Sequence, residues 1–230
     1  MAGEIALIVG AGSGLSAALA RRFGQEGMRV ALASRSESRL PADVLAGGAR
    51  SFRCDASRPK DVEALFAEVE RELGVPDLVV YNASYRTRGP LVELDPAEVE
   101  RALAVTCYGG FLVGQAAARR MLRLGHGTIL FTGASASVKG YPQSAPFAMG
   151  KFGLRGLAQS MARELAPRNI HVAHFVIDGG IAGPGHAGED RGPDGLLKPE
   201  AIAETYLNIH RQHRSAWTWE VELRPWLEKF

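Results

Sequence analysis

Short runs of apolar and β-branched residues alternate along this chain with longer segments whose apolar positions recur every three to four residues. The short runs are typical of buried strands and the longer segments of amphipathic helices. The pattern predicts strands at residues 5–9, 30–34, 50–53, 78–81, 128–131, 171–176 and 219–223. It predicts helices at residues 14–26, 60–73, 96–124, 144–166 and 199–210. This alternation indicates an α/β fold, a doubly wound, Rossmann-type parallel sheet of about seven strands with helices on both faces.

Two segments depart from this alternation. Residues 182–198 are crowded with Gly, Pro and charged residues. Because a loop of this length is typically either a functional lid or disordered, we interpret it as a substrate lid. Residues 215–230 hold the three tryptophans and alternate apolar with polar positions, which predicts an edge strand followed by a tail. The tryptophans either form an interface between subunits or anchor the C-terminus to its own domain, and both interpretations stay open.

Composition and charge narrow the function classes. The 230 residues, 46% of them hydrophobic, predict a single domain spanning residues 1–230. The net charge of +2 is spread along the chain without a block of like charges, so we expect a small-molecule substrate and neither nucleic acid nor a membrane as partner. Cys54 and Cys107 are too few for a disulfide framework, and no targeting segment is recognisable, so we expect a cytoplasmic protein. His210 and His213 lack a matching acidic or cysteine partner, so we expect no metal site.

A glycine-rich turn joins the first predicted strand to the first predicted helix. Glycine permits positive φ and close approach of the backbone to phosphate oxygens, and the positive dipole end of the following helix faces their charge. The glycine pattern is imperfect, because Ser16 stands at its last position, and the alternative is a tight turn between packed elements. The strand–turn–helix context favours a dinucleotide, whose pyrophosphate we expect at Gly10, Gly12, Ser13, Gly14 and Leu15.

In this order, the turn and several later motifs resemble the short-chain dehydrogenase/reductase family, over nearly the whole chain up to about Asp178. The family's T-G-x-x-x-G-x-G turn is matched by Val9, Gly10, Gly14 and Ser16. The resemblance implies NAD(H) or NADP(H) binding, with further cofactor contacts at Asp55, Ala56, Asn82, Ala83, Ser84, Lys151 and Ile181. It also implies a homodimer or homotetramer assembled through the two long helices, both of which carry small residues that permit close helix approach.

The end of the second predicted strand bears on the choice of cofactor. An acidic side chain there would bind the ribose 2′-hydroxyl of NAD, whereas an arginine would accommodate the 2′-phosphate of NADP. This chain has Ser34 and Arg35 at that point, so NADP(H) is favoured over NAD(H). Glu37 is the counter-argument, because an acid nearby would neutralise Arg35 or contact a ribose hydroxyl itself.

The catalytic positions depart from the family's pattern. The resemblance places the family's tyrosine at Phe147, its serine at Ala134 and its asparagine at Thr106, and leaves the lysine as Lys151. Phenylalanine has no ionisable proton, and loss of a positioned general acid typically lowers a rate by about 10²–10⁴-fold. Ser135 and Tyr141 are the candidate replacements for the missing hydroxyls.

Two hypotheses for function remain. The first is an NADP(H)-dependent oxidoreductase of the short-chain type that acts on a small carbonyl or alcohol through a non-standard active site centred on Lys151. The alternative is a catalytically impaired NADP(H)-binding sensor or structural protein. We favour the enzyme, because a pocket with a cofactor site is the default location of activity.

Overall fold

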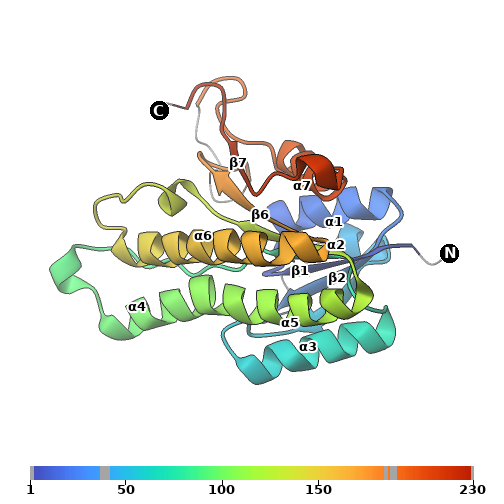
Figure 1. Ribbon diagram of the computed structural model, residues 1–230. Helices are drawn as coiled ribbons and strands as arrows, with labels where there is room; N and C mark the ends of the chain where they lie inside the picture. The colour runs from blue at the N-terminus through green and yellow to red at the C-terminus, as the bar shows by residue number, and fades with distance from the viewer. Residues whose placement is uncertain (1–2, 37–41, 184–185, 187–190, 229–230) are drawn as a thin grey trace.

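The computed structural model describes residues 3–36, 42–183, 186 and 191–228, which form a parallel sheet covered by helices on both faces (Figure 1). The strand order is β3-β2-β1-β4-β5-β6-β7, and every neighbouring pair is parallel. The predicted fold class is therefore confirmed. The strands are β1 Ile5–Val9, β2 Arg29–Ser34, β3 Arg50–Arg53, β4 Leu78–Tyr81, β5 Gly127–Thr132, β6 Ile170–Ile177 and β7 Glu220–Leu223.

Helices cover the sheet because successive strand side chains point to opposite faces and both sets are apolar. Ala6 and Ile8 of β1 pack with α1, α2 and α7, whereas Leu7 and Val9 pack with α3, α5 and α6. The helices are α1 Leu15–Gln25, α2 Ala42–Ala46, α3 Pro59–Glu72, α4 Pro96–Leu103, α5 Gly109–Leu124, α6 Ala145–Leu165 and α7 Pro199–His210. No helix in these described ranges is long and apolar enough to cross a membrane.

The helix expected at residues 96–124 is not uniform. A π-helical turn, Ala104–Tyr108, separates α4 from α5 and holds Thr106 fully buried. Such a turn inserts an extra residue into a helix and is often found at functional sites. The five-residue helix α2 was not expected from the sequence, because it is too short to show a helical period.

The small residues of the long helices serve contacts inside one chain. A Cβ on Gly110 of α5 would lie 2.4 Å from Leu154 Cδ1 of α6, and one on Gly150 of α6 would lie 2.9 Å from Thr106 Cβ. These glycines therefore set how closely α6 approaches α5 and the π-helical turn that precedes it. Because contacts within one chain explain these glycines, they are not evidence for a contact between subunits.

The predicted edge strand near residue 219 is present as β7, which pairs with β6 at the edge of the sheet. Two tryptophans beside it pack on their own domain: Trp217 stacks on His171 at a ring-centroid distance of 4.7 Å, and Trp219 lies 5.7 Å from the Arg155 guanidinium carbon. Trp226 is 73% exposed. Trp217 and Trp219 therefore anchor the C-terminal segment to its own domain.

The two ends of the segment expected to form a lid, residues 182–198, pair with each other. Ile181 bridges Leu197, and the Ala182 N–H donates to the Leu197 carbonyl at 2.8 Å. Residues 184–185 and 187–190 of the expected lid, like Glu37, lie outside the described residues.

A buried polar chain ties β7 to the loop after β5. The Ala134 N–H donates to Ser137 Oγ at 3.1 Å, which in turn lies 3.2 Å from His174 Nε2. His174 Nδ1 lies 3.1 Å from a Glu220 oxygen, and Arg155 donates to both Glu220 oxygens at 2.6 and 2.8 Å. Because a carboxylate only accepts, His174 donates from Nδ1. Burial disfavours the charged imidazolium, and in the neutral ring Nε2 accepts from the Ser137 hydroxyl.

This chain predicts how stability depends on pH. Burial lowers the pKa of His174 to about 4, from an ordinary value near 6.5. Between these values the unfolded protein binds a proton that the folded protein does not, so stability falls as the pH drops from about 6.5 to 4, by up to about 1.4 kcal/mol per pH unit. We expect His174→Gln to flatten this part of the profile, measured by urea unfolding at pH 4.5, 5.5 and 6.5.

The exposed His213, which hydrogen-bonds Ser215, offers the matched control. His213→Gln is expected to leave the slope unchanged. If His174→Gln and the parent protein show the same slope, the proton uptake on unfolding comes from other groups and the expectation is wrong.

Candidate active site

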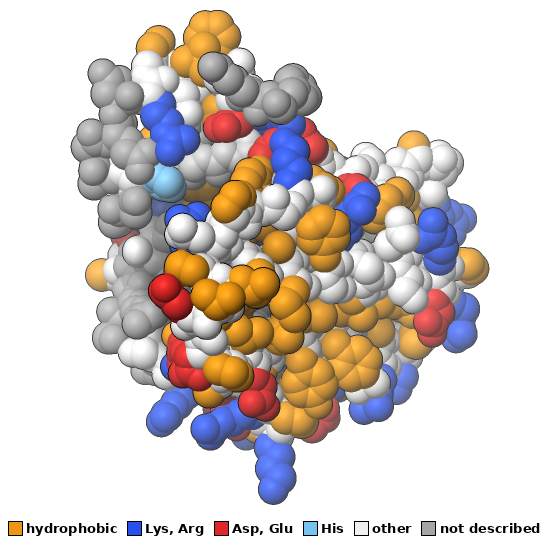
Figure 2. All heavy atoms as spheres, turned by 90° about the vertical axis from the view of Figure 1, so that its left-hand side faces the viewer, with side chains coloured by type: hydrophobic (Ala, Val, Ile, Leu, Met, Phe, Trp, Pro, Cys, Tyr) orange, Lys and Arg blue, Asp and Glu red, His pale blue; other side chains and the backbone are white. Residues whose placement is uncertain are grey.

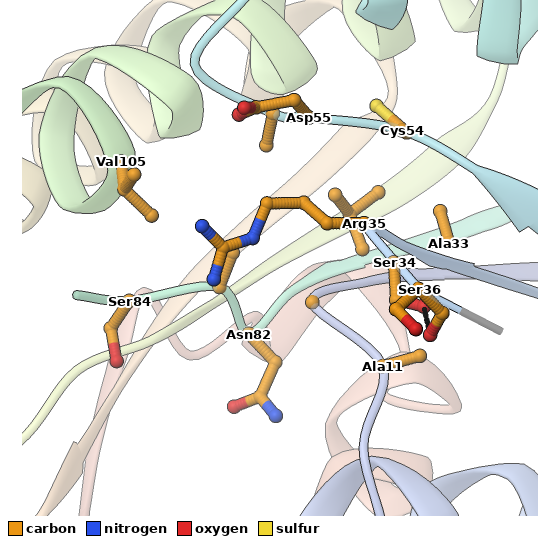
Figure 3. A pocket seen from close by; sticks show the side chains of 14 residues that line it. Ala11, Ala33, Ser34, Arg35, Ser36, Cys54, Asp55, Asn82, Ser84 and Val105 are labelled. Carbon is orange, nitrogen blue, oxygen red and sulfur yellow. Dashed lines mark hydrogen bonds between the residues drawn. The ribbon is translucent and has the colours of Figure 1, made fainter. Parts of the chain in front are cut away.

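A pocket of about 500 Å³ opens at the carboxyl ends of β1, β2, β3 and β4 (Figure 3). It lies where β1 is flanked by β2 on one side and by β4 on the other, the point at which the connections leave the sheet in opposite directions. Open α/β sheets bind ligands at such switch points. The lining includes eight of the residues expected to contact a cofactor: Gly10, Ser34, Arg35, Asp55, Ala56, Asn82, Ala83 and Ser84.

The glycine-rich turn has two kinds of glycine. Gly10 has φ +95°, and a Cβ there would lie 2.3 Å from the Ala83 backbone nitrogen, so the fold itself requires glycine. Gly12 and Gly14 have no atom within 4 Å of a built Cβ, so no neighbour in the described structure requires them to be glycine. This open space, together with the α1 N-terminus that begins at Leu15, fits a phosphate group that approaches the backbone closely.

Ser16, the departure from the glycine pattern, joins the turn to the loop after β4. It is buried, its hydroxyl donates to the Gly10 carbonyl at 3.0 Å, and it accepts from Asn82 Nδ2 at 2.7 Å. The Asn82 N–H donates to the Val9 carbonyl at 2.8 Å. The substitution of serine for glycine therefore adds a link between two walls of the pocket.

Arg35 and Asp55 supply the charges of the pocket. Figure 3 shows the Arg35 side chain reaching across the pocket between Asp55 and Asn82. Although partial burial opposes it, hydrogen bonds from Ser57 and the positive charge of Arg35 lower the pKa of Asp55. Ser34 is less available than expected from the sequence, because its hydroxyl already donates to the Ser36 carbonyl at 2.8 Å. Arg35 is therefore the positively charged side chain in the lining of the pocket.

Lys151 and Phe147 lie one turn apart on α6. Lys151 is 3% exposed, and its ammonium donates to the Thr132 carbonyl at 2.7 Å. Burial lowers the pKa of Lys151 to about 8. Its Nζ lies 5.8 Å from the centroid of the Phe147 ring. A buried ammonium whose pKa is lowered toward neutral pH thus lies beside Phe147.

The remaining catalytic candidates are placed differently from one another. Ser135 is half-buried in the turn after β5, whereas Ser137 is held in the chain with His174. Tyr141 is 45% exposed in the same loop. Tyr85, another phenol in a loop at this edge of the sheet, donates to Glu98, and this hydrogen bond raises the pKa of Tyr85. Within the described structure, the hydroxyls of Ser135 and Tyr141 thus make no side-chain hydrogen bond.

Two further expected residues have structural contacts. Thr106 Oγ1 accepts from the Tyr85 N–H at 3.1 Å, so it holds the loop after β4 against the π-helical turn. Ile181 lies after β6 in its bridge with Leu197 rather than in the lining of the pocket.

Sequence reasoning missed Arg86. Its guanidinium carbon lies 4.7 Å from the centroid of the Phe147 ring, which places a second cation beside the ring already flanked by Lys151. The signal in the sequence was weak, because Arg86 belongs to a loop in which arginine is ordinarily solvated. Only folding brings this loop against α6.

Comparisons with known proteins agree with this geometry. Residues 4–185 match the family model described as short chain dehydrogenase. The D-threitol dehydrogenase of Mycolicibacterium smegmatis is 31% identical over 175 residues, which cover 74% of this chain and 67% of that protein. The crystal structure of a short-chain dehydrogenase from Rhodopseudomonas palustris is 34% identical, with a TM-score of 0.83, and covers 97% of this chain and 99% of that chain.

A metagenomic short-chain oxidoreductase solved in complex with NADP is 28% identical, with a TM-score of 0.84, and covers 99% of both chains. The family match extends over most of the sequence, from β1 past β6. The chain therefore belongs to the short-chain dehydrogenase family.

Proposed function

We propose that this protein is an NADP(H)-dependent oxidoreductase that acts on a small carbonyl or alcohol through a non-standard active site. The observation that carries the proposal is the pocket at the switch point, in which Arg35 faces a cavity walled by the glycine-rich turn and the loop after β4. The family supports the reaction type, and the NADP bound to the metagenomic relative supports the class of cofactor.

The residues present fit the cofactor along its length. The turn from Gly10 to Leu15 would hold the pyrophosphate, and Arg35 the 2′-phosphate. Asp55 and Ala56 would contact the adenine, and the segment Asn82-Ala83-Ser84 would support the ribose. Lys151 and Ile181 would lie toward the nicotinamide. When bound, the cofactor supplies or accepts the hydride.

The proton that accompanies hydride transfer would come from side chains of the protein. In this proposal Phe147 replaces the family's tyrosine and has no proton to give. Lys151, with its pKa lowered to about 8 by burial, holds a proton that exchanges near neutral pH and is the group best placed beside the ring. Ser135 and Tyr141 are secondary candidates for a hydroxyl donor.

The same absence of a phenol supports a second candidate function. A protein that binds NADP(H) without turning it over would serve as a redox sensor or a structural subunit. We place it second, because the Lys151 ammonium and the pocket are both retained.

Cofactor preference depends on Arg35. We expect NADPH to bind at least about tenfold more tightly than NADH, and Arg35→Ala to remove most of this difference, about 1.4 kcal/mol or more. The reason is that the guanidinium pairs with the 2′-phosphate, which NADH lacks.

Isothermal calorimetry with NADPH and with NADH measures this difference in affinity. Arg53→Ala, on the neighbouring strand β3, is the control; equal affinities in the parent protein would contradict the NADP assignment.

Restoring the phenol tests the active site directly. Phe147→Tyr adds a hydroxyl one helical turn before Lys151, whose positive charge lowers the pKa of a phenol. We expect turnover of an activated ketone, 2,2,2-trifluoroacetophenone, with NADPH to rise about tenfold or more, a fraction of the ~10²–10⁴ that a full general acid contributes.

Phe147→Leu serves as the matched control, because it changes the ring without adding a proton donor. A rise with leucine as large as with tyrosine would mean that pocket size, not acid catalysis, limits the rate. No turnover by parent or variant, with NADPH binding intact, would favour the non-enzymatic alternative.

We also propose a homodimer or homotetramer. Large hydrophobic side chains of the long helices are exposed, among them Tyr108, Phe111, Met149 and Phe152, and Figure 2 shows hydrophobic side chains gathered broadly over one face. An apolar groove runs between α4, α5 and α6, lined by Leu103, Ala104, Cys107, Tyr108, Phe111 and Leu157 with Glu100. Exposed apolar area of this kind marks an interaction site.

Burial of this groove against a second copy predicts an assembly at micromolar concentration. Light scattering should give a multiple of the 24.6 kDa chain mass. Phe111→Glu, which places a charge in the groove, should shift the mass toward that of one chain. The same substitution at Leu227, exposed in the tail, should not. A parent protein of single-chain mass would contradict the assembly.

A further inference from the structure

The ring of Phe147 lies beside two positive groups from different parts of the chain. The Arg86 guanidinium carbon is 4.7 Å from the ring centroid, and Lys151 Nζ is 5.8 Å from it. Both distances allow the cations to be attracted by the negative face of the ring. This attraction orients Arg86 but leaves the ring uncharged, so it does not neutralise either cation.

Neither cation has a carboxylate partner among the residues that the structure describes. The Lys151 ammonium donates to a backbone carbonyl instead. Two acidic side chains on neighbouring elements have other partners. Glu98 accepts a hydrogen bond from Tyr85 and forms an ion pair with Arg101. Asp178 forms ion pairs with Lys139 and Arg224. Partial burial and the repulsion from Arg88 lower the pKa of Arg86, as expected where positive charge is in excess.

A positive site of this kind selects an anion. Arg86 is exposed, so a ligand reaches it without displacing packed atoms. A guanidinium that stacks its face on an aromatic ring keeps its N–H edge free, and that edge matches the two oxygens of a carboxylate. Charge-assisted pairs of this geometry are stronger than neutral hydrogen bonds and are strongest where water is partly excluded.

We propose that Arg86 is the substrate-binding residue of this site and that the substrate carries a carboxylate. This inference rests on the proposed function and names its substrate class, an oxo acid or the corresponding hydroxy acid. In the reducing direction the ketone carbon takes the hydride and its oxygen takes one proton, which yields the hydroxy acid and the oxidised cofactor. Arg86 holds the carboxylate, and the Phe147 ring holds Arg86.

Benzoylformate and its methyl ester provide the probes, because methylation removes the negative charge that Arg86 would recognise. We expect kcat/KM with NADPH to be at least about tenfold higher for the acid than for the ester. Arg86→Gln should abolish this preference, with the loss appearing in KM rather than in kcat, because a ground-state contact is removed. Arg86→Lys, which keeps the charge but not the planar fork, should retain part of it.

Arg101→Gln is the control, since Arg101 also stacks on a ring, Tyr85, with its guanidinium carbon 4.6 Å from the centroid, but pairs with Glu98. It should leave the preference for the acid unchanged. Equal use of acid and ester by the parent protein, or an unchanged preference in Arg86→Gln, would overturn the proposal. Tighter binding of phenyl phosphate than of benzoylformate would overturn the assignment of a carboxylate.

Binding measurements separate this inference from the proposed function. Calorimetry of benzoylformate against the cofactor-free protein and against the protein saturated with NADP⁺ needs no turnover. We expect the acid to bind at least about tenfold more tightly than the ester in both states, and this difference to vanish in Arg86→Gln. Failure to bind NADPH or NADP⁺ would contradict the proposed function alone, while the cofactor-free titration would still decide the role of Arg86.

Discussion

The rest of the structure depends on the contact between the glycine-rich turn and the loop after β4. Gly10 approaches Ala83 so closely that any side chain would overlap its backbone, and the hydrogen bond between Ser16 and Asn82 closes the same junction. Because β1 pairs with both β2 and β4, this contact lies where the connections leave the continuous sheet in opposite directions. The pocket opens at this switch point, so its position follows from the topology rather than from any ligand.

Charge in and beside this pocket is arranged unevenly. At one end, Arg35 is balanced in part by Asp55, whose pKa it helps to lower. Outside the residues that line this pocket, Lys151 and Arg86 flank the neutral Phe147 ring without a carboxylate between them in the described structure. The Phe147 ring cannot carry a negative charge, so we propose that the compensating negative charge comes from the substrate.

Hydrogen bonds link the C-terminal edge of the sheet to a loop that carries two of the catalytic candidates. The chain from Ala134 through Ser137, His174 and Glu220 joins the loop after β5 to the edge strand β7. Burial favours the neutral form of His174, whose pKa is lowered to about 4, and in this form Nδ1 donates to Glu220 while Nε2 accepts from Ser137. The edge strand β7 is therefore connected to the loop that carries Ser135 and Tyr141.

The sequence by itself determined the order of the strands, the glycine-rich turn, the spacing of Phe147 and Lys151 one helical turn apart, and the presence of Arg35 after β2, because each depends on residues close together in the chain. Only the tertiary structure placed Arg86 on the Phe147 ring, joined Ser137 to Glu220 and turned the glycines of α5 and α6 into contacts within one chain. These relations join segments far apart in sequence. Periodicity shows which face of an element is buried but not which loop will lie against it, and that is decided by the packing of the whole sheet.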